Sequence, residues 1–207
     1  MADRLKKINP RLEEYISEIK RDVRNIPEGR RVLLDVLSNY IRERGEVQLI
    51  FICTHNSRRS HMSQIWAQVA ASYYQVSGVQ TYSGGTEATS FNPRAVEAMK
   101  RAGFQIEGNS GSNPKYQISY GPQFETMIAW SKKYDDPQNP ASDFAAVMTC
   151  SDADEACPIV VGADARIPLF YEDPKDFDGT LQEEEKYDER CRQIATEMLY
   201  VMSKANA

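Results

Sequence analysis

The sequence predicts an α/β fold: a doubly wound parallel sheet with helices on both faces, preceded by an N-terminal helical hairpin. From residue 47 onward, short apolar segments alternate with amphipathic segments of helical periodicity. The first apolar segment has no polar face, as in a strand at the centre of a helix-covered sheet. A chain of 207 residues is long enough for one such domain with an added element. We therefore expect a helical extension over residues 1–45 and an α/β domain over residues 46–207.

The extension shows helical periodicity twice. Apolar residues recur every three or four positions over residues 5–26, and Pro27 and Gly29 end this pattern. A second apolar stripe covers residues 32–41 and stops before Gly45. Neither helix carries recognisable chemistry. We interpret them as an element for packing or for a homodimer contact.

Strand and helix patterns alternate in the rest of the chain. Helical patterns follow the first two strands, and Asn92 and Pro93 suit the cap and first turn of a helix that closes at Gly103. A long helix is expected at residues 183–204, and the polar residues 132–143 are expected to form a surface loop. The apolar runs typical of strands lie at residues 47–52, 79–85, 144–150 and 166–170.

Composition excludes several classes of protein. A net charge of −5 without a long basic stripe argues against a nucleic-acid surface. No apolar run approaches the length needed to cross a membrane, and the N-terminus lacks the apolar core of an export signal. We therefore expect a cytoplasmic protein, in which reducing conditions keep cysteines as thiols. The four cysteines are Cys53, Cys150, Cys157 and Cys191.

The segment CTHNSRRS, residues 53–60, joins the first strand to the following helix and is called the anion loop below. Such a loop points successive backbone N–H groups into a concavity at the positive end of a helix, where tetrahedral oxyanions bind. Arg59 can hold two oxygens of the anion while the sulfur of Cys53 lies beneath its central atom. The positive electrostatic field of these groups is expected to make Cys53 react as a thiolate nucleophile. The predicted anion-binding residues are Thr54, His55, Asn56, Ser57, Arg58, Arg59 and Ser60.

A small core residue is the alternative interpretation of Cys53. The order of cysteine, Arg59, Ser60 and amphipathic helix favours the catalytic interpretation, with Ser60 donating a hydrogen bond to the thiolate. No metal site is expected, because the only histidines, His55 and His61, are not followed by carboxylates or cysteines at ligand spacing. No cofactor is expected either.

These segments resemble a known family. CTHNSRRS followed by MSQIW resembles the phosphate-binding loop of low-molecular-weight protein tyrosine phosphatases and of arsenate reductases built on the same fold. The resemblance continues through TYSGGTEATSFNPRAVEAMKRAGF, TCSDADEACP and the EDP at 172–174. It implies a low-molecular-weight phosphatase-like fold from residue 47 to the C-terminus. His55 stands where the family usually has glycine, so strain is expected if this position needs a positive φ.

Two features bear on the branch of the family. The resemblance assigns Asp173, before Pro174, as the acid that protonates a leaving oxygen, although a turn-forming aspartate is the alternative. Lys175 then stands where the phosphatases carry aromatic residues, which weakens the phosphatase interpretation. The segment CSDADEAC resembles the resolving cysteines of thioredoxin-coupled arsenate reductases.

The resemblance implies that Cys53 attacks arsenate, that Cys150 then expels arsenite and forms a disulfide with Cys53, and that Cys157 takes over Cys150. Thioredoxin would reduce the final pair. A regular helix separates positions seven residues apart by about 10.5 Å, whereas a disulfide joins Cα atoms about 5.5 Å apart. The segment between Cys150 and Cys157 must therefore unwind. Cys191 follows the apolar face of the last helix and is assigned to the core.

Three functions follow as hypotheses. The first is a thioredoxin-coupled arsenate reductase. The second is a phosphatase that hydrolyses phosphate monoesters through a phosphocysteine at Cys53, with the later cysteines only protecting it from oxidation. The third is an anion-binding or redox-sensing module without turnover, in which His55 has disrupted the anion loop.

Overall fold

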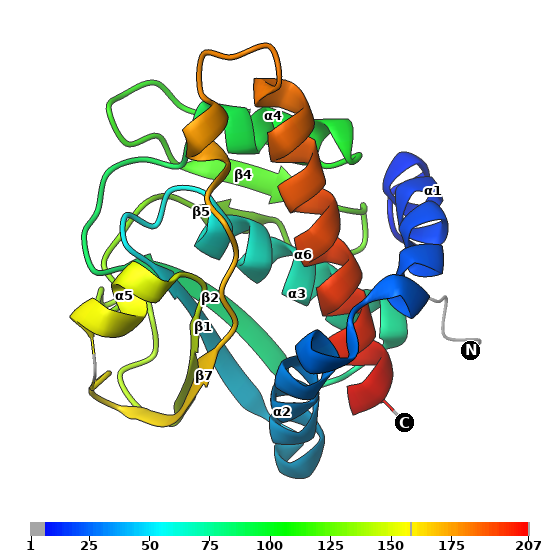
Figure 1. The fold of residues 1–207 in the computed structure, drawn as a ribbon, viewed down its shortest axis with the longest axis vertical. Coiled ribbons are helices and arrows are strands. Elements are labelled where there is room, and N and C mark those ends of the chain that lie inside the picture. The colour runs from blue at the N-terminus through cyan, green and yellow to red at the C-terminus, as the bar shows by residue number, and fades with distance from the viewer. Residues whose placement is uncertain (1–6, 158, 207) are drawn as a thin grey trace.

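The computed structural model describes residues 7–157 and 159–206 (Figure 1). The elements in chain order are α1 (Pro10–Ile19), the 3₁₀ helix η1 (Lys20–Asn25), α2 (Glu28–Arg44), β1 (Val47–Cys53), α3 (Arg59–Tyr74), β2 (Val79–Gly85), α4 (Pro93–Arg101), β3 (Gln105–Gly108), β4 (Tyr116–Ser119), β5 (Met127–Ala129), β6 (Phe144–Met148), α5 (Ser151–Ala156), β7 (Ala163–Pro168), the 3₁₀ helix η2 (Pro174–Phe177) and α6 (Glu183–Ala205).

A parallel sheet in the order β2-β1-β6-β7 confirms the predicted architecture. β1 lies between β2 and β6, and its residue Ile52 pairs with Gly84 on one side and Met148 on the other. The carboxyl ends of parallel strands meet at one edge of a sheet. Cys53, the last residue of β1, and Cys150, two residues after the end of β6, therefore come together there.

Helices cover both faces of the sheet, as predicted, but unequally (Figure 1). On one face Leu49 and Phe51 of β1 belong to a large core with Trp66 of α3 and residues of α6. On the other face Ile50 and Ile52 belong to a smaller cluster that α5 and the segment around residue 160 cover. The helical layer on the second face is thinner, because α5 has only six residues.

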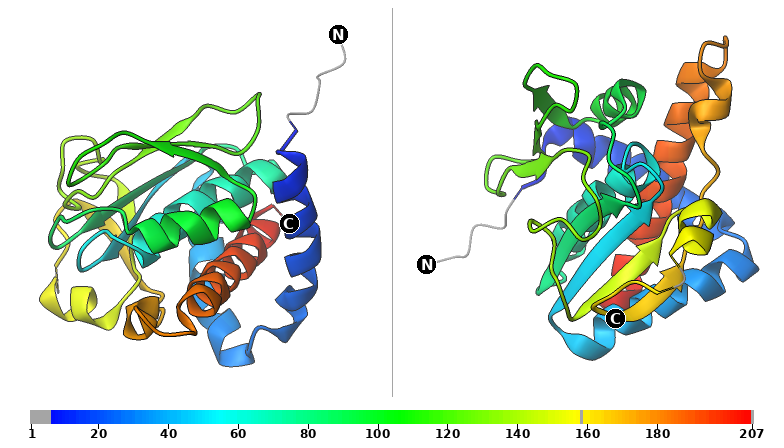
Figure 2. Two further views of the ribbon diagram at one scale, coloured as in Figure 1. Left: turned by 90° about the horizontal axis from the view of Figure 1, so that it is seen from above. Right: turned by 90° about the vertical axis from the view of Figure 1, so that its left-hand side faces the viewer.

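The predicted N-terminal helices are confirmed, with a change of geometry in the first. Its α-helical part ends at Ile19 and continues as η1, while Leu5, where the predicted stripe began, lies outside the described residues. Both α1 and α2 pack against α6 (Figure 2). Leu12 and Leu37 are fully buried in the same core as the sheet. The domain boundary at residue 45 and the homodimer contact stay predictions.

The helix after β2 begins and ends where the sequence predicted. The side chain of Asn92 accepts a hydrogen bond of 2.9 Å from the backbone N–H of Arg94, which caps α4. Gly103 then has a φ of +112°, and a Cβ atom there would lie 2.7 Å from the backbone nitrogen of Leu12. Only glycine fits this turn, because it combines a left-handed backbone with close contact to α1.

Two segments differ from expectation. The antiparallel sheet β3-β4-β5 was not predicted, since its strands have only three or four residues each. The loop over residues 132–143 is not a surface loop throughout, because Lys132 and Asn139 are buried. The amide of Asn139 donates hydrogen bonds to the carbonyls of Ser83, Lys133 and Tyr134. Within this polar segment, the side chain of Asn139 therefore forms a hydrogen bond to the end of β2.

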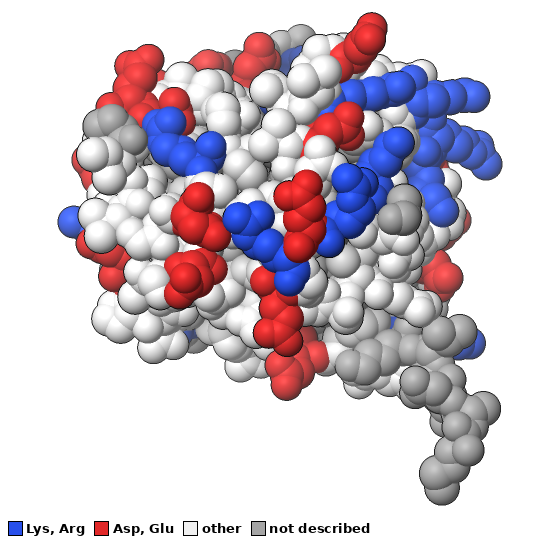
Figure 3. Space-filling model, turned by 90° about the horizontal axis from the view of Figure 1, so that it is seen from below, with Lys and Arg blue, Asp and Glu red and all other residues white. Residues whose placement is uncertain are grey.

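No helix within the described residues combines the length and the apolar character needed to cross a bilayer. On the face seen from below, Asp and Glu side chains lie among the Lys and Arg side chains over its middle (Figure 3).

Candidate active site

The anion loop leaves the carboxyl end of β1 and enters α3. The Sγ atom of Cys53 lies 3.1 Å from the Oγ atom of Ser60. Ser60 Oγ also accepts a hydrogen bond of 2.9 Å from the side chain of Asn56. Because that hydroxyl already accepts a hydrogen bond, its own hydrogen is available to donate to the sulfur. Asn56 Oδ1 in turn accepts from the backbone N–H of Lys132 at 2.9 Å, which fixes the loop against its neighbour.

The left-handed position of the loop is Asn56, with a φ of +44°, and not His55. Asparagine tolerates this conformation better than most residues. The strain expected at His55 is therefore absent. The carbonyl of His55 accepts hydrogen bonds from the hydroxyls of Ser131 and Thr89, at 2.8 and 3.3 Å. Its ring is 44% exposed and lies 3.6 Å from the carboxylate of Glu87, so it does not enter the loop.

The carbonyl groups of the anion loop are bonded to the surrounding segments. The carbonyl of Cys53 accepts from the N–H of Thr86, that of Thr54 accepts from the N–H of Glu87, and that of Ser57 accepts from the N–H of Asn92. Among the residues that the structure describes, no hydrogen-bond partner is seen for the backbone N–H groups of residues 54–58. These donors are the groups that an oxyanion would engage.

Arg59 and Asp173 meet although they lie 114 residues apart in sequence. Arg59 Nη2 donates to Asp173 Oδ2 at 2.8 Å, and Arg59 Nη1 donates to the carbonyl of Tyr171 at 2.9 Å. The remaining Nε of Arg59 is buried without a hydrogen-bond partner among the described residues. Asp173 also accepts from the N–H of Lys175 at the start of η2. The predicted arginine and acid therefore share one site.

Arg58 has a different environment from the one expected. Its side chain is only 15% exposed; Nε donates to the hydroxyl of Tyr187 at 2.8 Å, and Nη2 lies 3.5 Å from Asp178. Burial, together with the hydrogen bond to Asp178, raises the pKa of Tyr187 to about 12, so this hydroxyl stays protonated. Arg58 therefore ties the start of α3 to the segment after η2. The helical periodicity over residues 183–204 gives no sign of this contact between Tyr187 and Arg58.

The two candidate resolving cysteines stand at opposite ends of α5. Cys150 caps the N-terminus of this helix, and its sulfur lies 3.5 Å from the hydroxyl of Thr54, the neighbour of Cys53. Cys157 follows the last turn and is partly exposed. All four cysteines are free thiols, as expected. Nothing in this helix is unwound, so the predicted rearrangement would begin from an intact α5.

Cys191 lies apart from this group. Its sulfur accepts a hydrogen bond of 3.3 Å from the indole of Trp66 and lies 3.6 Å from the sulfur of Met99. Burial raises the pKa of the Cys191 thiol to about 12. A thiol in this state is a poor nucleophile, which agrees with its assignment to the core.

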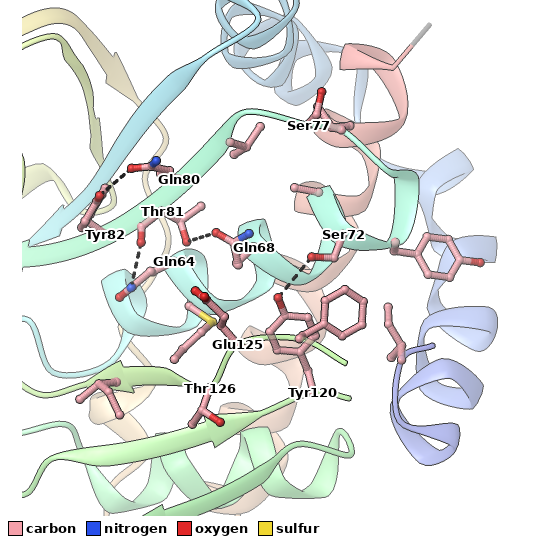
Figure 4. A pocket seen from close by; sticks show the side chains of 18 of the residues that line it. Gln64, Gln68, Ser72, Ser77, Gln80, Thr81, Tyr82, Tyr120, Glu125 and Thr126 are labelled. Atoms are coloured by element: carbon pink, nitrogen blue, oxygen red, sulfur yellow. Dashed lines mark hydrogen bonds between the residues drawn. The ribbon is translucent and has the colours of Figure 1, made fainter. Parts of the chain in front are cut away.

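A pocket of about 1320 Å³ lies elsewhere, between α3, β2 and residues 120–132 (Figure 4). Its labelled polar side chains include Gln64, Gln68 and Thr81, and no residue of the anion loop lines it. Within the described ranges, no three histidine, cysteine or acidic side chains are grouped to hold a metal ion.

Comparison with known proteins decides the family. A family model described as low molecular weight phosphotyrosine protein phosphatase matches residues 48–121. Arsenate reductase 2 of Staphylococcus epidermidis is 32% identical over 127 residues, which cover 61% of this chain and 77% of that protein. The chain belongs to the arsenate reductase branch of the low-molecular-weight phosphatase family. The arsenate reductase of Bacillus subtilis is 28% identical over 144 residues, which cover 70% of this chain and 86% of that protein.

Two solved structures share the fold of this chain. A YwlE mutant from Bacillus subtilis superposes with a TM-score of 0.53 at 16% identity, over 76% of this chain and 97% of that one. A low molecular weight phosphotyrosine phosphatase from Vibrio cholerae O395 gives 0.51 at 12% identity, over 76% and 94%. The fold that the sequence resemblance implied is therefore confirmed.

Proposed function

We propose that this member of the family reduces arsenate to arsenite, with Cys53 as nucleophile, Cys150 and Cys157 as a disulfide relay, and thioredoxin as the reductant. The observation that carries the proposal is the position of Cys150. Its sulfur lies against Thr54, the residue next to Cys53, at the edge where β1 and β6 both end. The relatives named arsenate reductase support the choice of substrate.

In the first step the oxyanion binds to the free N–H groups of residues 54–58 and to Arg59, whose Nε has no other partner among the described residues. The thiolate of Cys53 attacks the arsenic, and one As–O bond breaks. Asp173, held beside Arg59, gives the departing oxygen a proton so that it leaves as water. Ser60 stabilises the thiolate before the attack.

In the second step the thiolate of Cys150 attacks the sulfur of Cys53. The S–As bond breaks and its electron pair stays on the arsenic, which is reduced from As(V) to As(III) and leaves as arsenite. In the third step the thiolate of Cys157 attacks the sulfur of Cys150, and Cys53 departs as a thiolate. The dithiol of thioredoxin then reduces the Cys150–Cys157 disulfide.

The third step requires α5 to open. Cys150 and Cys157 flank the six helical residues Ser151–Ala156. A helix rises about 1.5 Å per residue, so an intact α5 holds its two ends too far apart for a disulfide between these cysteines. The helix has six residues, of which only Ala153 is buried, so few apolar contacts oppose its opening. The ion pair of 2.6 Å between Arg166 and Asp154 is the main side-chain contact that must break.

Hydrolysis of a phosphate monoester is the second candidate. The observation that favours it is the contact between Asp173 and Arg59, because a phosphatase of this type needs an acid beside its anion site. This reaction needs Cys53 but neither Cys150 nor Cys157. Variants of the later cysteines therefore separate the two functions.

The test is arsenate-dependent NADPH consumption in the presence of thioredoxin and its reductase. Cys53→Ser, Cys150→Ser and Cys157→Ser should each abolish it, whereas Cys191→Ser, a matched control outside the site, should not. Aryl phosphate hydrolysis is measured alongside. Hydrolysis that survives Cys150→Ser, without arsenate-dependent NADPH consumption by the unmodified protein, would establish the phosphatase instead.

A further inference from the structure

Arg30 lies on α2, outside the residues that match the family model. Its Nε and Nη2 atoms donate to the two carboxylate oxygens of Glu197 on α6, at 3.0 and 2.7 Å. Glu197 is 3% exposed and also accepts from the amide of Gln193. The guanidinium carbon of Arg30 lies 4.8 Å from the ring centre of Tyr171. The N-terminal extension therefore contacts a residue that belongs to the candidate active site.

Tyr171 connects this contact to the catalytic groups. It lies two residues before Asp173, and its carbonyl accepts the hydrogen bond from Nη1 of Arg59. Its N–H donates to the carbonyl of Thr149 at 3.0 Å, directly before Cys150. The ring is buried, and burial with the nearby Glu197 carboxylate raises the pKa of Tyr171 well above its ordinary value. The neutral ring therefore acts by position and not as an acid.

We propose that Arg30 is a positioning residue for oxyanion chemistry, acting through Tyr171. The planar guanidinium, oriented by Glu197, holds the Tyr171 ring in place, and the Tyr171 backbone then sets where Arg59 and Asp173 stand. Lysine cannot replace this contact, because it can pair with a carboxylate but lacks a planar group to stack on a ring. The inference rests on the proposed function only for the identity of the oxyanion.

A purely structural role for the Arg30–Glu197 pair is the competing explanation, since breaking a buried ion pair destabilises a protein. Arg192 provides the matched control. It also joins α6 to the N-terminal elements, with ion pairs of 2.8 Å to Asp22 and 2.7 Å to Glu18. Unlike Arg30, it makes no contact with Tyr171 among those that the structure shows.

The experiment compares Arg30→Lys and the double variant Arg30→Leu with Glu197→Leu against Arg192→Lys. The double variant leaves no unpaired carboxylate, and the same measurements on it test the proposal if Arg30→Lys does not fold. The first readout is amide hydrogen exchange of residues 169–173. The second is the phosphate concentration that halves the rate of Cys53 alkylation by iodoacetamide.

In the Arg30 variants, exchange over residues 169–173 should rise about fivefold, and the protective phosphate concentration should rise about tenfold. Arg192→Lys should change neither by more than about twofold. Arg30 variants that leave both readouts unchanged, or an equal effect of Arg192→Lys, would overturn the proposal. Phosphate protection needs no reduction of arsenate. A protein without arsenate turnover would therefore refute the proposed function and still give a reading on Arg30.

Discussion

Lys132, whose backbone N–H is bonded to Asn56 of the anion loop, provides a test of the electrostatics of burial. It is 6% exposed, and within the described residues no carboxylate lies within ion-pair distance of its ammonium group, which stands 4.6 Å from the ring centre of Trp130. Burial lowers the pKa of Lys132 from 10.5 to about 8, while Asp136 acts weakly in the opposite direction. A folded-state pKa below the unfolded value means that the folded chain holds the proton less tightly. The destabilisation is therefore complete below pH 8 and is relieved as the pH rises toward 10.5.

The difference between the two pKa values corresponds to about 3 kcal/mol at pH 7. Lys132→Met removes the buried charge at similar volume. We expect removal of the charge to raise the free energy of unfolding by about 3 kcal/mol at pH 7 and by about 1 kcal/mol at pH 10. Loss of the contact with Trp130 reduces each of these gains by about 0.5–1 kcal/mol.

Urea unfolding of both proteins at the two pH values measures these differences. Lys115→Met is the control, because the exposed Lys115 also stands 4.6 Å from the centre of the Trp130 ring. It reports the loss of the ring contact without the burial. If Lys132→Met has the same effect at pH 7 and pH 10, or if it destabilises the protein at pH 7, then the buried charge of Lys132 does not destabilise the folded chain.

Three further predictions concern the site and its surroundings. Asp173→Asn should lower kcat for arsenate about 100-fold, as measured with thioredoxin in excess; an unchanged kcat would remove Asp173 from the reaction. Gly85→Ala should lower the free energy of unfolding by about 2 kcal/mol and weaken phosphate binding, because its Cβ would lie 2.7 Å from the nitrogen of Asn56 and would also collide with the carbonyl of Glu87. Calorimetry checks both effects, with Gly29→Ala as a control where a Cβ meets nothing within 4 Å. Cys191→Ala should keep full turnover and lose about 1 kcal/mol of stability, and a loss of turnover would give Cys191 a part in the relay.

The sequence was most informative where structure and chemistry are local. An apolar strand, a loop of fixed length and an amphipathic helix follow one another directly, so the anion loop with Cys53 and Arg59 could be read from one short segment. The cap at Asn92 is equally local, since its acceptor and donor are two residues apart. The predicted strands over residues 47–52 and 144–150 also ended at Cys53 and Cys150, and parallel strands end at a common edge.

Contacts across long sequence distances could not be read in this way. The hydrogen bond from Arg58 to Tyr187 joins residues that lie 129 positions apart in the sequence. Helical periodicity indicates only that Tyr187 faces the core. The stack of Arg30 on Tyr171 joins the extension to a loop near the other end of the chain. A polar segment also gives no sign that one of its lysines is buried, which is why Lys132 was expected at the surface.

The relay itself is tested most directly by trapping its first disulfide. Cys157→Ser is incubated with arsenate and without thioredoxin, and the disulfides are mapped by mass spectrometry after alkylation. We expect a Cys53–Cys150 disulfide that forms only with arsenate, together with one arsenite released per chain. Release of arsenite without this disulfide, or a disulfide that forms equally without arsenate, would contradict it.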